Sequence, residues 1–325
     1  MFTDADLISL TLLALPDSPP PARLEAILKG GSDRCFYRLQ YDEAERPSVI
    51  LMTYTLARAD NPRFVAATGR LEKLGVRVPK IYAHDEKNLC VWLEDLGSID
   101  LHAFREESWA IREPLYQAAL RQVAKLHSVN SNALTTADIA EMELSFDEDL
   151  YKWEQNYFLT HYVQDVLKRD TNADSYITSH DALHELRHYL AELPRGLVHR
   201  DFQSQNVLIR NGHAWLIDYQ GVRPGLAEYD LASLLLDPYV DLADSERDAL
   251  LKWYAEFTAR DYAALRETYL LCAAQRLMQA IGAYANLSRN LGKPHFAEHI
   301  PVALTRLEGI CAQHPALKLL PRFWQ

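Results

Sequence analysis

One short polar stretch, together with an aspartate that follows it, constrains this chain of 325 residues more than any other feature. The stretch covers residues 199–206 and reads His-Arg-Asp-Phe-Gln-Ser-Gln-Asn, and Asp218 follows it at the end of an apolar run. A positioned carboxylate such as that of Asp201 can accept the proton of a hydroxyl group. Mg²⁺ is bound through hard oxygen atoms such as those of Asn206 and Asp218. The pattern therefore predicts a phosphoryl-transfer site, with Asp201 as the base and with Asn206 and Asp218 holding Mg²⁺ against the phosphates of ATP.

Each of these three residues also has an ordinary structural explanation. Asp201 could lie in a surface turn, Asn206 could cap a turn, and Asp218 could simply end a strand. The combination favours the functional interpretation, because the base and the metal ligands of kinases follow one another in this order and at this spacing.

The excess of acidic over basic residues limits the kinds of partner that this chain can bind. The 34 Lys and Arg residues against 45 Asp and Glu give a formal net charge of −11. That charge argues against a general surface for nucleic acid or anionic membrane. No apolar run reaches the roughly 18 residues of a membrane span, and the first residues, with Asp4 and Asp6, lack the basic start of a signal peptide. We therefore expect a cytoplasmic protein with no nucleic-acid or membrane partner.

The local patterns change at about residue 97. Before it, short β-type runs predict strands over residues 24–28, 35–41, 48–54, 81–84 and 89–93. Two helices are expected there, over 4–15 and over 61–74, the second with Asn61 as its cap. After it, helical periodicity predicts helices over 109–129, 144–166, 173–193 and most of the chain from 227. A short hairpin is expected around Asn211-Gly212. We expect an α+β, bilobal fold, in which residues 1–97 form a small strand-rich N-terminal lobe with a hinge and residues 98–325 form a larger helical lobe.

The first turn of the strand-rich lobe is a candidate phosphate site. Gly30, Gly31 and Ser32 follow a predicted strand, and such a turn can bring backbone N–H groups close to phosphates. The same residues would also suit a plain hairpin turn. Arg34 and Arg38 lie nearby, where they could contact phosphate or remain solvated strand residues.

A second motif points to different chemistry. Residues 184–188 read His-Glu-Leu-Arg-His, the pattern with which a helix presents two zinc ligands. Ala191 and Pro194 occupy the places where the longer form of this motif has its Gly and third His. We therefore expect a solvent-facing helix here rather than a zinc site.

The motifs together resemble the aminoglycoside phosphotransferase and choline kinase family, which has a protein-kinase-like fold. Within it, the chain is similar to the bacterial anomeric kinases of N-acetylmuramate and N-acetylglucosamine that serve peptidoglycan recycling. The segments that carry this resemblance are residues 30–34, 93–97, 199–206, 217–223 and 229–240. Only about a dozen residues separate Asp218 from residue 229, where a protein kinase has a long activation loop, so the substrate is expected to be a small molecule.

The resemblance implies roles for further residues. Glu94 and Leu96 would offer backbone groups to adenine, Asp201 would be the base, and Asn206 and Asp218 would bind Mg²⁺. The activity implied is transfer of the γ-phosphoryl group of ATP to the anomeric hydroxyl of an amino sugar. A kinase of another small alcohol, such as an aminoglycoside or choline, and a catalytically weak nucleotide-binding pseudokinase remain as alternatives.

One position departs from the usual kinase pattern. Kinases carry a Lys on the third strand that holds the α- and β-phosphates, and here Met52 lies near the expected place. Which cation replaces that Lys is open, and Arg34 is the candidate.

Overall fold

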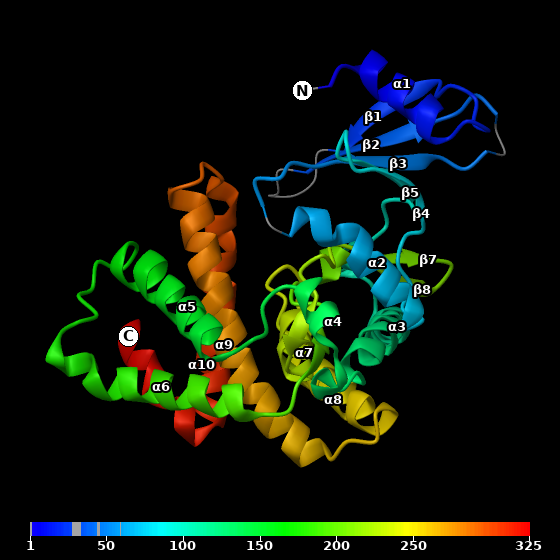
Figure 1. Ribbon diagram of the computed structural model, residues 1–325. Helices are drawn as coiled ribbons and strands as arrows, with labels where there is room; N and C mark the ends of the chain where they lie inside the picture. The colour runs from blue at the N-terminus through cyan, green and yellow to red at the C-terminus, as the bar shows by residue number, and fades with distance from the viewer. Residues whose placement is uncertain (1, 28–33, 44–45, 59) are drawn as a thin grey trace.

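The strand-rich lobe is an antiparallel sheet. A computed structural model describes residues 2–27, 34–43, 46–58 and 60–325. The sheet has five strands in the order β1-β2-β3-β5-β4. Their bounds are β1 (Arg23–Ile27), β2 (Cys35–Gln40), β3 (Val49–Thr53), β4 (Ile81–Asp85) and β5 (Cys90–Glu94). Helix α1 (Asp4–Ala14) lies against the outer side of the sheet, and α2 (Phe64–Lys73) lies between the sheet and the helical lobe (Figure 1).

The two faces of this sheet pack into different hydrophobic cores. Because successive side chains of a strand point to opposite faces, Leu51 and Trp92 join a small outer core with Leu7 of α1. Met52 points to the other face and belongs to the large core that continues into the helical lobe. Arg38 of β2 pairs in register with Ile50, two residues before Met52, and so shares the inner face. The inner face of the sheet thus carries both apolar and cationic side chains toward the helical lobe.

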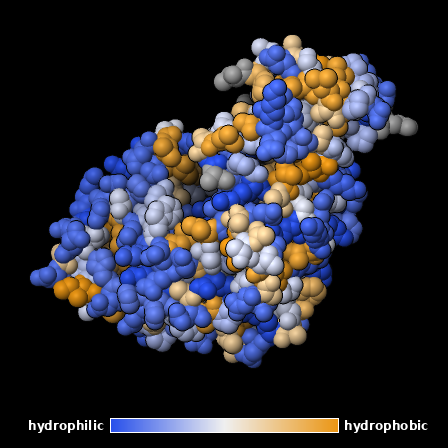
Figure 2. Space-filling view, viewed as in Figure 1, coloured by the Kyte–Doolittle hydropathy of each residue, from blue (hydrophilic) through white to orange (hydrophobic). Residues whose placement is uncertain are grey.

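Helices dominate the rest of the chain. They are α3 (Trp109–His127), α4 (Thr136–Ala140), α5 (Glu148–Phe158), α6 (Ile177–Glu192), α7 (Ala227–Leu235), α8 (Asp244–Phe257), α9 (Tyr262–Arg289) and α10 (Ile300–Gln313). The long α9 packs on α5, α7 and α10. Two small antiparallel ladders pair β6 (Gly196–Val198) with β9 (Arg223–Gly225) and β7 (Val207–Arg210) with β8 (His213–Leu216). The space-filling view shows a small lobe joined to a larger one by a narrower region (Figure 2).

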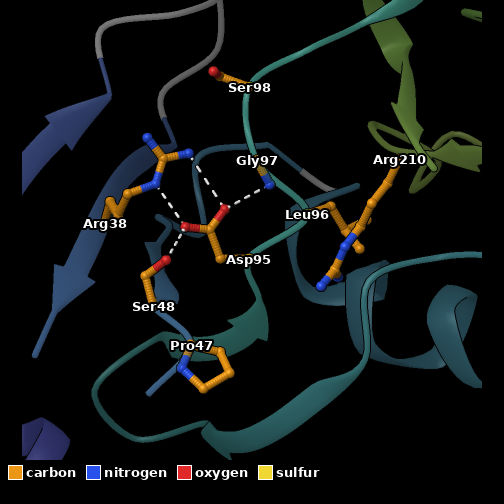
Figure 3. Close-up of a pocket in the computed structure, with 8 residues that line it drawn as sticks. All are labelled: Arg38, Pro47, Ser48, Asp95, Leu96, Gly97, Ser98 and Arg210. Atoms are coloured by element: carbon orange, nitrogen blue, oxygen red, sulfur yellow. Dashed lines mark hydrogen bonds and ion pairs between the residues drawn. The ribbon is translucent and has the colours of Figure 1, made fainter. Parts of the chain in front are cut away.

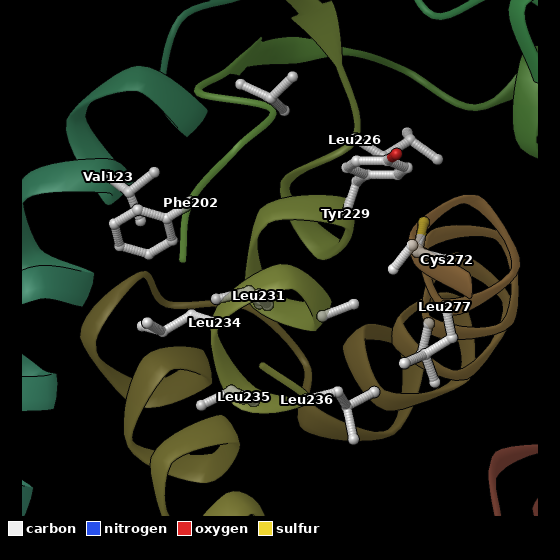
Figure 4. Close-up of a cluster of buried hydrophobic side chains, with 14 of the residues drawn as sticks. Val123, Phe202, Leu226, Tyr229, Leu231, Leu234, Leu235, Leu236, Cys272 and Leu277 are labelled. Atoms are coloured by element: carbon white, nitrogen blue, oxygen red, sulfur yellow. The ribbon is translucent and has the colours of Figure 1, made fainter. Parts of the chain in front are cut away.

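Helix α7 packs next to the predicted catalytic stretch, residues 199–206. Figure 4 shows it between Val123 of α3 and the α9 residues Cys272 and Leu277. Phe202, from the middle of the stretch, is fully buried in the same core, which fixes the loop to the helices. Gly196 allows β6 to approach α3, since a Cβ atom there would lie 2.6 Å from the carbonyl oxygen of His127.

The α+β, bilobal prediction is confirmed, and so is the hairpin at Asn211 and Gly212, whose φ angles of 52° and 72° are those of a tight primed turn. Some local predictions are wrong. Asn61 does not cap the helix; its Nδ2 donates to the carbonyl oxygen of Thr55 at 2.9 Å. The helix expected over 144–166 begins at Glu148 and changes to a π-helix over Leu159–Gln164.

A backbone hydrogen bond joins the two parts of the chain, because the amide of Leu216 donates to the carbonyl oxygen of Arg77 at 2.9 Å. Just after the predicted boundary, the amide of Ile209 donates to the carbonyl oxygen of Ile99 at 2.8 Å. The boundary after residue 97 stays a prediction. In the described residues, none of the helices has both the length and the apolar character to cross a membrane.

Candidate active site

Asp230 holds the start of the catalytic stretch. Its carboxylate accepts from the backbone amides of His199 and Arg200 at 2.6 and 2.9 Å, and it lies 3.1 Å from Nε2 of His127. Asp230 lies in the first turn of α7. His199 is fully buried, and its Nε2 lies 3.0 Å from the carbonyl oxygen of Ile217. The two histidines therefore act as structural residues that fix the loop, with Arg200 at a φ of 77°.

Asp201 is partly open to solvent in the middle of this loop. Its side chain is 34% exposed, and its Oδ2 accepts from Nη1 of Arg200 at 3.0 Å. Burial alone would raise the pKa of Asp201, but the charges of Arg200 and then Arg276 outweigh it and hold the pKa below its ordinary value. The carboxylate is therefore ionised at neutral pH, which general-base chemistry requires.

Asn206 and Asp218 lie side by side because they flank one hairpin. Val207 pairs with Leu216 across β7 and β8, and the amide of Ile217 donates to the backbone oxygen of Asn206 at 3.0 Å. The Nδ2 of Asn206 donates to the backbone oxygen of Asp201 at 2.8 Å, which leaves its Oδ1 without a hydrogen bond from any described residue. Asp218 has a φ of 61° and a side chain that is 37% exposed. These hard oxygen donors fit a Mg²⁺ ion, which needs one or two protein ligands beside phosphate and water.

A cation from the strand-rich lobe, Arg34, lies beside Asp218. Arg34 is 9% exposed; its Nη1 donates to Oε1 of Gln220 at 2.7 Å, and its Nη2 contacts Oδ1 of Asp218. Its Nε is buried without a partner in the described residues. Met52 is fully buried in the large core, so the third strand supplies no charge at this point.

Asp95, Leu96 and Gly97, which follow β5, line a cavity of about 410 Å³ (Figure 3). Asp95 is fixed beside it by Arg38, whose Nε lies 2.6 Å from Oδ2, and by the hydroxyl of Ser48, also at 2.6 Å. The amide of Leu96, a lining residue, donates to no described residue. The amide of Glu94 instead donates to the carbonyl oxygen of Lys80 at 2.8 Å, and its carboxylate pairs with Arg210 at 3.0 Å. In the described part of the lobe, the N–H of Leu96 therefore has no acceptor, whereas the N–H of Glu94 is engaged by Lys80.

Gly30, Gly31 and Ser32 lie outside the described residues, so their predicted phosphate contact stays a prediction. Sequence reasoning offered Arg34 and Arg38 as cations for the phosphates but missed the arginines beside Asp201. Arg200 and Arg223 lie together beside Gly221, where a Cβ atom would be 3.6 and 3.9 Å from atoms of their side chains. Their separation of about twenty residues in the chain carries no periodicity, so only the fold could bring them together.

The zinc-type motif lies on α6, away from this site in the chain. His184 and His188 are 57% and 59% exposed, and both face Glu148 of α5, at 3.7 and 3.2 Å. In the described part of the chain, no group of three or more His, Cys, Asp or Glu side chains is placed to hold a metal. Glu148 has a pKa held low by its hydrogen bond with His188, which fits a surface ion pair.

Comparison with known proteins identifies the family. A family model described as the phosphotransferase enzyme family matches residues 23–268. The chain belongs to this phosphotransferase enzyme family. It is an ATP-dependent kinase, and the resemblance found in its motifs is confirmed.

Individual relatives agree with this assignment. An N-acetylmuramate/N-acetylglucosamine kinase of Pseudomonas aeruginosa is 26% identical over 310 residues, which cover 92% of this chain and 86% of that protein. A choline kinase of Cryptosporidium parvum shares the fold, with a TM-score of 0.67 at 12% identity and 99% coverage of both chains. The streptomycin–ATP–APH(2")-IIa ternary complex gives a TM-score of 0.62 at 14% identity and covers 98% of this chain and 99% of that one. These structures show that the chain has the fold of choline kinases and aminoglycoside phosphotransferases.

Proposed function

We propose that this kinase transfers the γ-phosphoryl group of ATP to the anomeric hydroxyl of an amino sugar, N-acetylmuramate or N-acetylglucosamine, in the cytoplasm. The observation that carries the proposal is the likeness to the Pseudomonas aeruginosa enzyme over 92% of this chain. The product would be a sugar 1-phosphate.

The residues of the site support the chemistry step by step. Asp201 accepts the proton of the sugar hydroxyl while that oxygen attacks the γ-phosphorus, and the bond to the oxygen bridging to ADP breaks. An anomeric hydroxyl is more acidic than an ordinary alcohol, so one ionised carboxylate suffices as base. Asn206 and Asp218 would hold Mg²⁺, which neutralises charge on the phosphates when bound. Arg34 stands beside Asp218 and would hold phosphate oxygens in place of the missing third-strand Lys.

The charges around Asp201 disfavour the cationic alternatives. Three arginines, Arg200, Arg276 and Arg223, lie close enough to lower the pKa of Asp201. A cationic acceptor such as choline or an aminoglycoside would be repelled by them, whereas a neutral or anionic sugar would not. An ionised base and a complete pair of candidate metal ligands also favour an active kinase over a pseudokinase.

An ADP-release assay over N-acetylmuramate, N-acetylglucosamine, glucose, choline and kanamycin tests the acceptor class. We expect turnover only with the amino sugars, and no phosphorylation of their methyl glycosides, in which the anomeric oxygen is blocked. The product phosphate should be released by mild acid, as glycosyl phosphates are. Phosphorylation of a methyl glycoside at a comparable rate, or an acid-stable 6-phosphate seen by NMR, would overturn the anomeric assignment but not the kinase assignment.

A further inference from the structure

Gln220 is a nearly buried amide that contacts three charged side chains. It is 6% exposed, and its Oε1 accepts from Nη1 of Arg34 at 2.7 Å. Its Nε2 donates to Oδ1 of Asp218 at 3.2 Å and lies 3.5 Å from Oδ2 of Asp60. A guanidinium only donates hydrogen bonds and a carboxylate only accepts them, so this orientation of the amide is the one that suits all three partners. Gln220 therefore lies between a cation and two anions without adding a charge of its own.

These contacts leave the ion pair between Arg34 and Asp218 incomplete. An arginine frequently binds a carboxylate through two parallel N–H···O bonds. Arg58 does so with Asp60, from Nε to Oδ1 at 3.1 Å and from Nη2 to Oδ2 at 3.0 Å. Arg34 instead contacts Asp218 through Nη2 alone, while its Nη1 is held by Gln220. Oδ2 of Asp218 consequently accepts no hydrogen bond from any described residue.

The amide fixes this arrangement because it binds both members of the ion pair. The contacts from Arg34 to Gln220, from Gln220 to Asp218 and from Arg34 to Asp218 close a ring, which sets the angle between the guanidinium and the carboxylate. Asp60, just before α2, offers the amide a further acceptor that does not depend on Arg34. A single N–H···O contact is weaker than two parallel ones, so it is more readily exchanged for other partners.

We propose that Gln220 is a positioning residue for nucleotide binding. It keeps Arg34 and Asp218 from closing into a two-bond ion pair, so that the guanidinium can turn to the phosphates and the carboxylate to Mg²⁺. The inference rests on the roles proposed above for Arg34 and Asp218, and not on the identity of the acceptor. Gln220 acts through these two side chains rather than on the reacting atoms.

The test measures ATP binding by calorimetry, without a sugar, in the wild type, Gln220→Met, Arg34→Ala and the double variant. Gln220→Met keeps the length of the side chain but lacks both amide atoms. It should weaken ATP binding at least about 5-fold in the wild type but less than about 2-fold in Arg34→Ala, because changes that act through one shared contact are not additive. Gln220→Asn keeps the amide but is too short to reach both partners, so it should behave like Gln220→Met.

Two further measurements separate positioning from general damage. Gln220→Met should raise the Mg²⁺ concentration needed for half-maximal rate while the KM for the sugar stays near that of the wild type. Gln117→Met, the same change on α3 where the amide donates to Glu113 at 3.2 Å, is the matched control and should leave ATP binding unchanged. Thermal melting identifies the folded variants, and if Gln220→Met does not fold, the comparison is made with Gln220→Asn.

Other results would overturn the inference. Equal weakening of ATP binding with and without Arg34 would show that Gln220 does not act through this guanidinium. Unchanged ATP affinity in both Gln220→Met and Gln220→Asn would show that the amide positions nothing. If Arg34→Ala itself leaves ATP affinity unchanged, the proposed role of Arg34 fails and this inference fails with it. Turnover of neither amino sugar by the wild type would defeat the acceptor assignment alone, because ATP binding is measured without a sugar.

Discussion

The guanidinium of Arg34 forms an ion pair with the carboxylate of Asp218, and so links the strand-rich lobe to the end of the β7–β8 hairpin. Asp218 is the candidate metal ligand, and Arg34 is nearly buried beside it. When nucleotide binds, the phosphates would enter between these two groups, with the carboxylate toward the metal and the guanidinium toward the phosphate oxygens. We expect Arg34, in this position, to neutralise phosphate charge in place of the missing third-strand Lys.

Replacing Arg34 by Ala should weaken ATP binding about tenfold or more, because a charge-assisted contact to phosphate is lost. The dissociation constant for ATP, measured by calorimetry, checks this. Arg46→Ala is the control, since Arg46 lies in the same lobe but contacts Ser18. Unchanged ATP affinity in Arg34→Ala would remove Arg34 from the nucleotide site.

Asp201→Asn should lower kcat by about 10²–10⁴ while ATP affinity stays nearly intact. The change keeps the shape of the side chain but removes the base and its charge. Steady-state kinetics and calorimetry measure the two quantities. A variant that keeps more than about a third of the wild-type kcat would exclude Asp201 as the base, given the loss expected of a missing general base.

Asp218→Ala should abolish Mg²⁺-dependent turnover, and Asn206→Ala should raise the Mg²⁺ concentration needed for half-maximal rate. The reason is the loss of an oxygen ligand that bridges the metal to the phosphates. Rates measured over a Mg²⁺ titration check both. If Asp218→Ala responds to Mg²⁺ like the wild type, the metal ligands lie elsewhere.

The acid side of the pH profile should depend on Arg200. Burial opposes ionisation of Asp201, and Arg200 is the strongest of the charges that nonetheless hold its pKa below the ordinary value. The base is lost as the pH falls through that lowered pKa, so wild-type kcat/KM should persist to pH values below the usual carboxylate range. Arg200→Gln should raise the pKa of Asp201 and shift the acid limb to higher pH, while Arg200→Lys should shift it less. An acid limb that stays in place in Arg200→Gln would contradict this origin of the shift.

Asp230→Ala should lower both stability and turnover. It would leave the amides of His199 and Arg200 without their acceptor, and unsatisfied buried donors cost about 2–3 kcal/mol. Chemical denaturation and kcat measure the two effects. Asp244→Ala, at a side chain that is 94% exposed, is the control and should change stability by less than about 0.5 kcal/mol. Equal stability of Asp230→Ala and the wild type would show that the loop is held by other contacts.

The sequence predicted the elements whose signals are local. Alternating and helical periodicity depend on neighbouring residues, so the five strands of the sheet and most helices could be predicted. Asn211-Gly212 sets its own turn by the φ angles that these residues tolerate. Asp201, Asn206 and Asp218 are near one another in the sequence and also lie together in the fold, because a short loop and one hairpin connect them. The three-residue strands β6 and β9 were missed, since so short a run carries no periodicity.

The sequence by itself therefore determined the two-lobed fold, the family and the order of the candidate base and metal ligands. The sequence offered Arg34 as a candidate cation, and only the tertiary structure decided which cations in fact surround these residues. Arg34, Arg200 and Arg276 come from three distant parts of the chain, and an arginine in sequence is as readily a solvated surface residue as a buried ligand. Packing between elements removes water from some of them and leaves others exposed. That burial, and the closeness of these cations to the ionised Asp201 or Asp218, gives these side chains their expected roles.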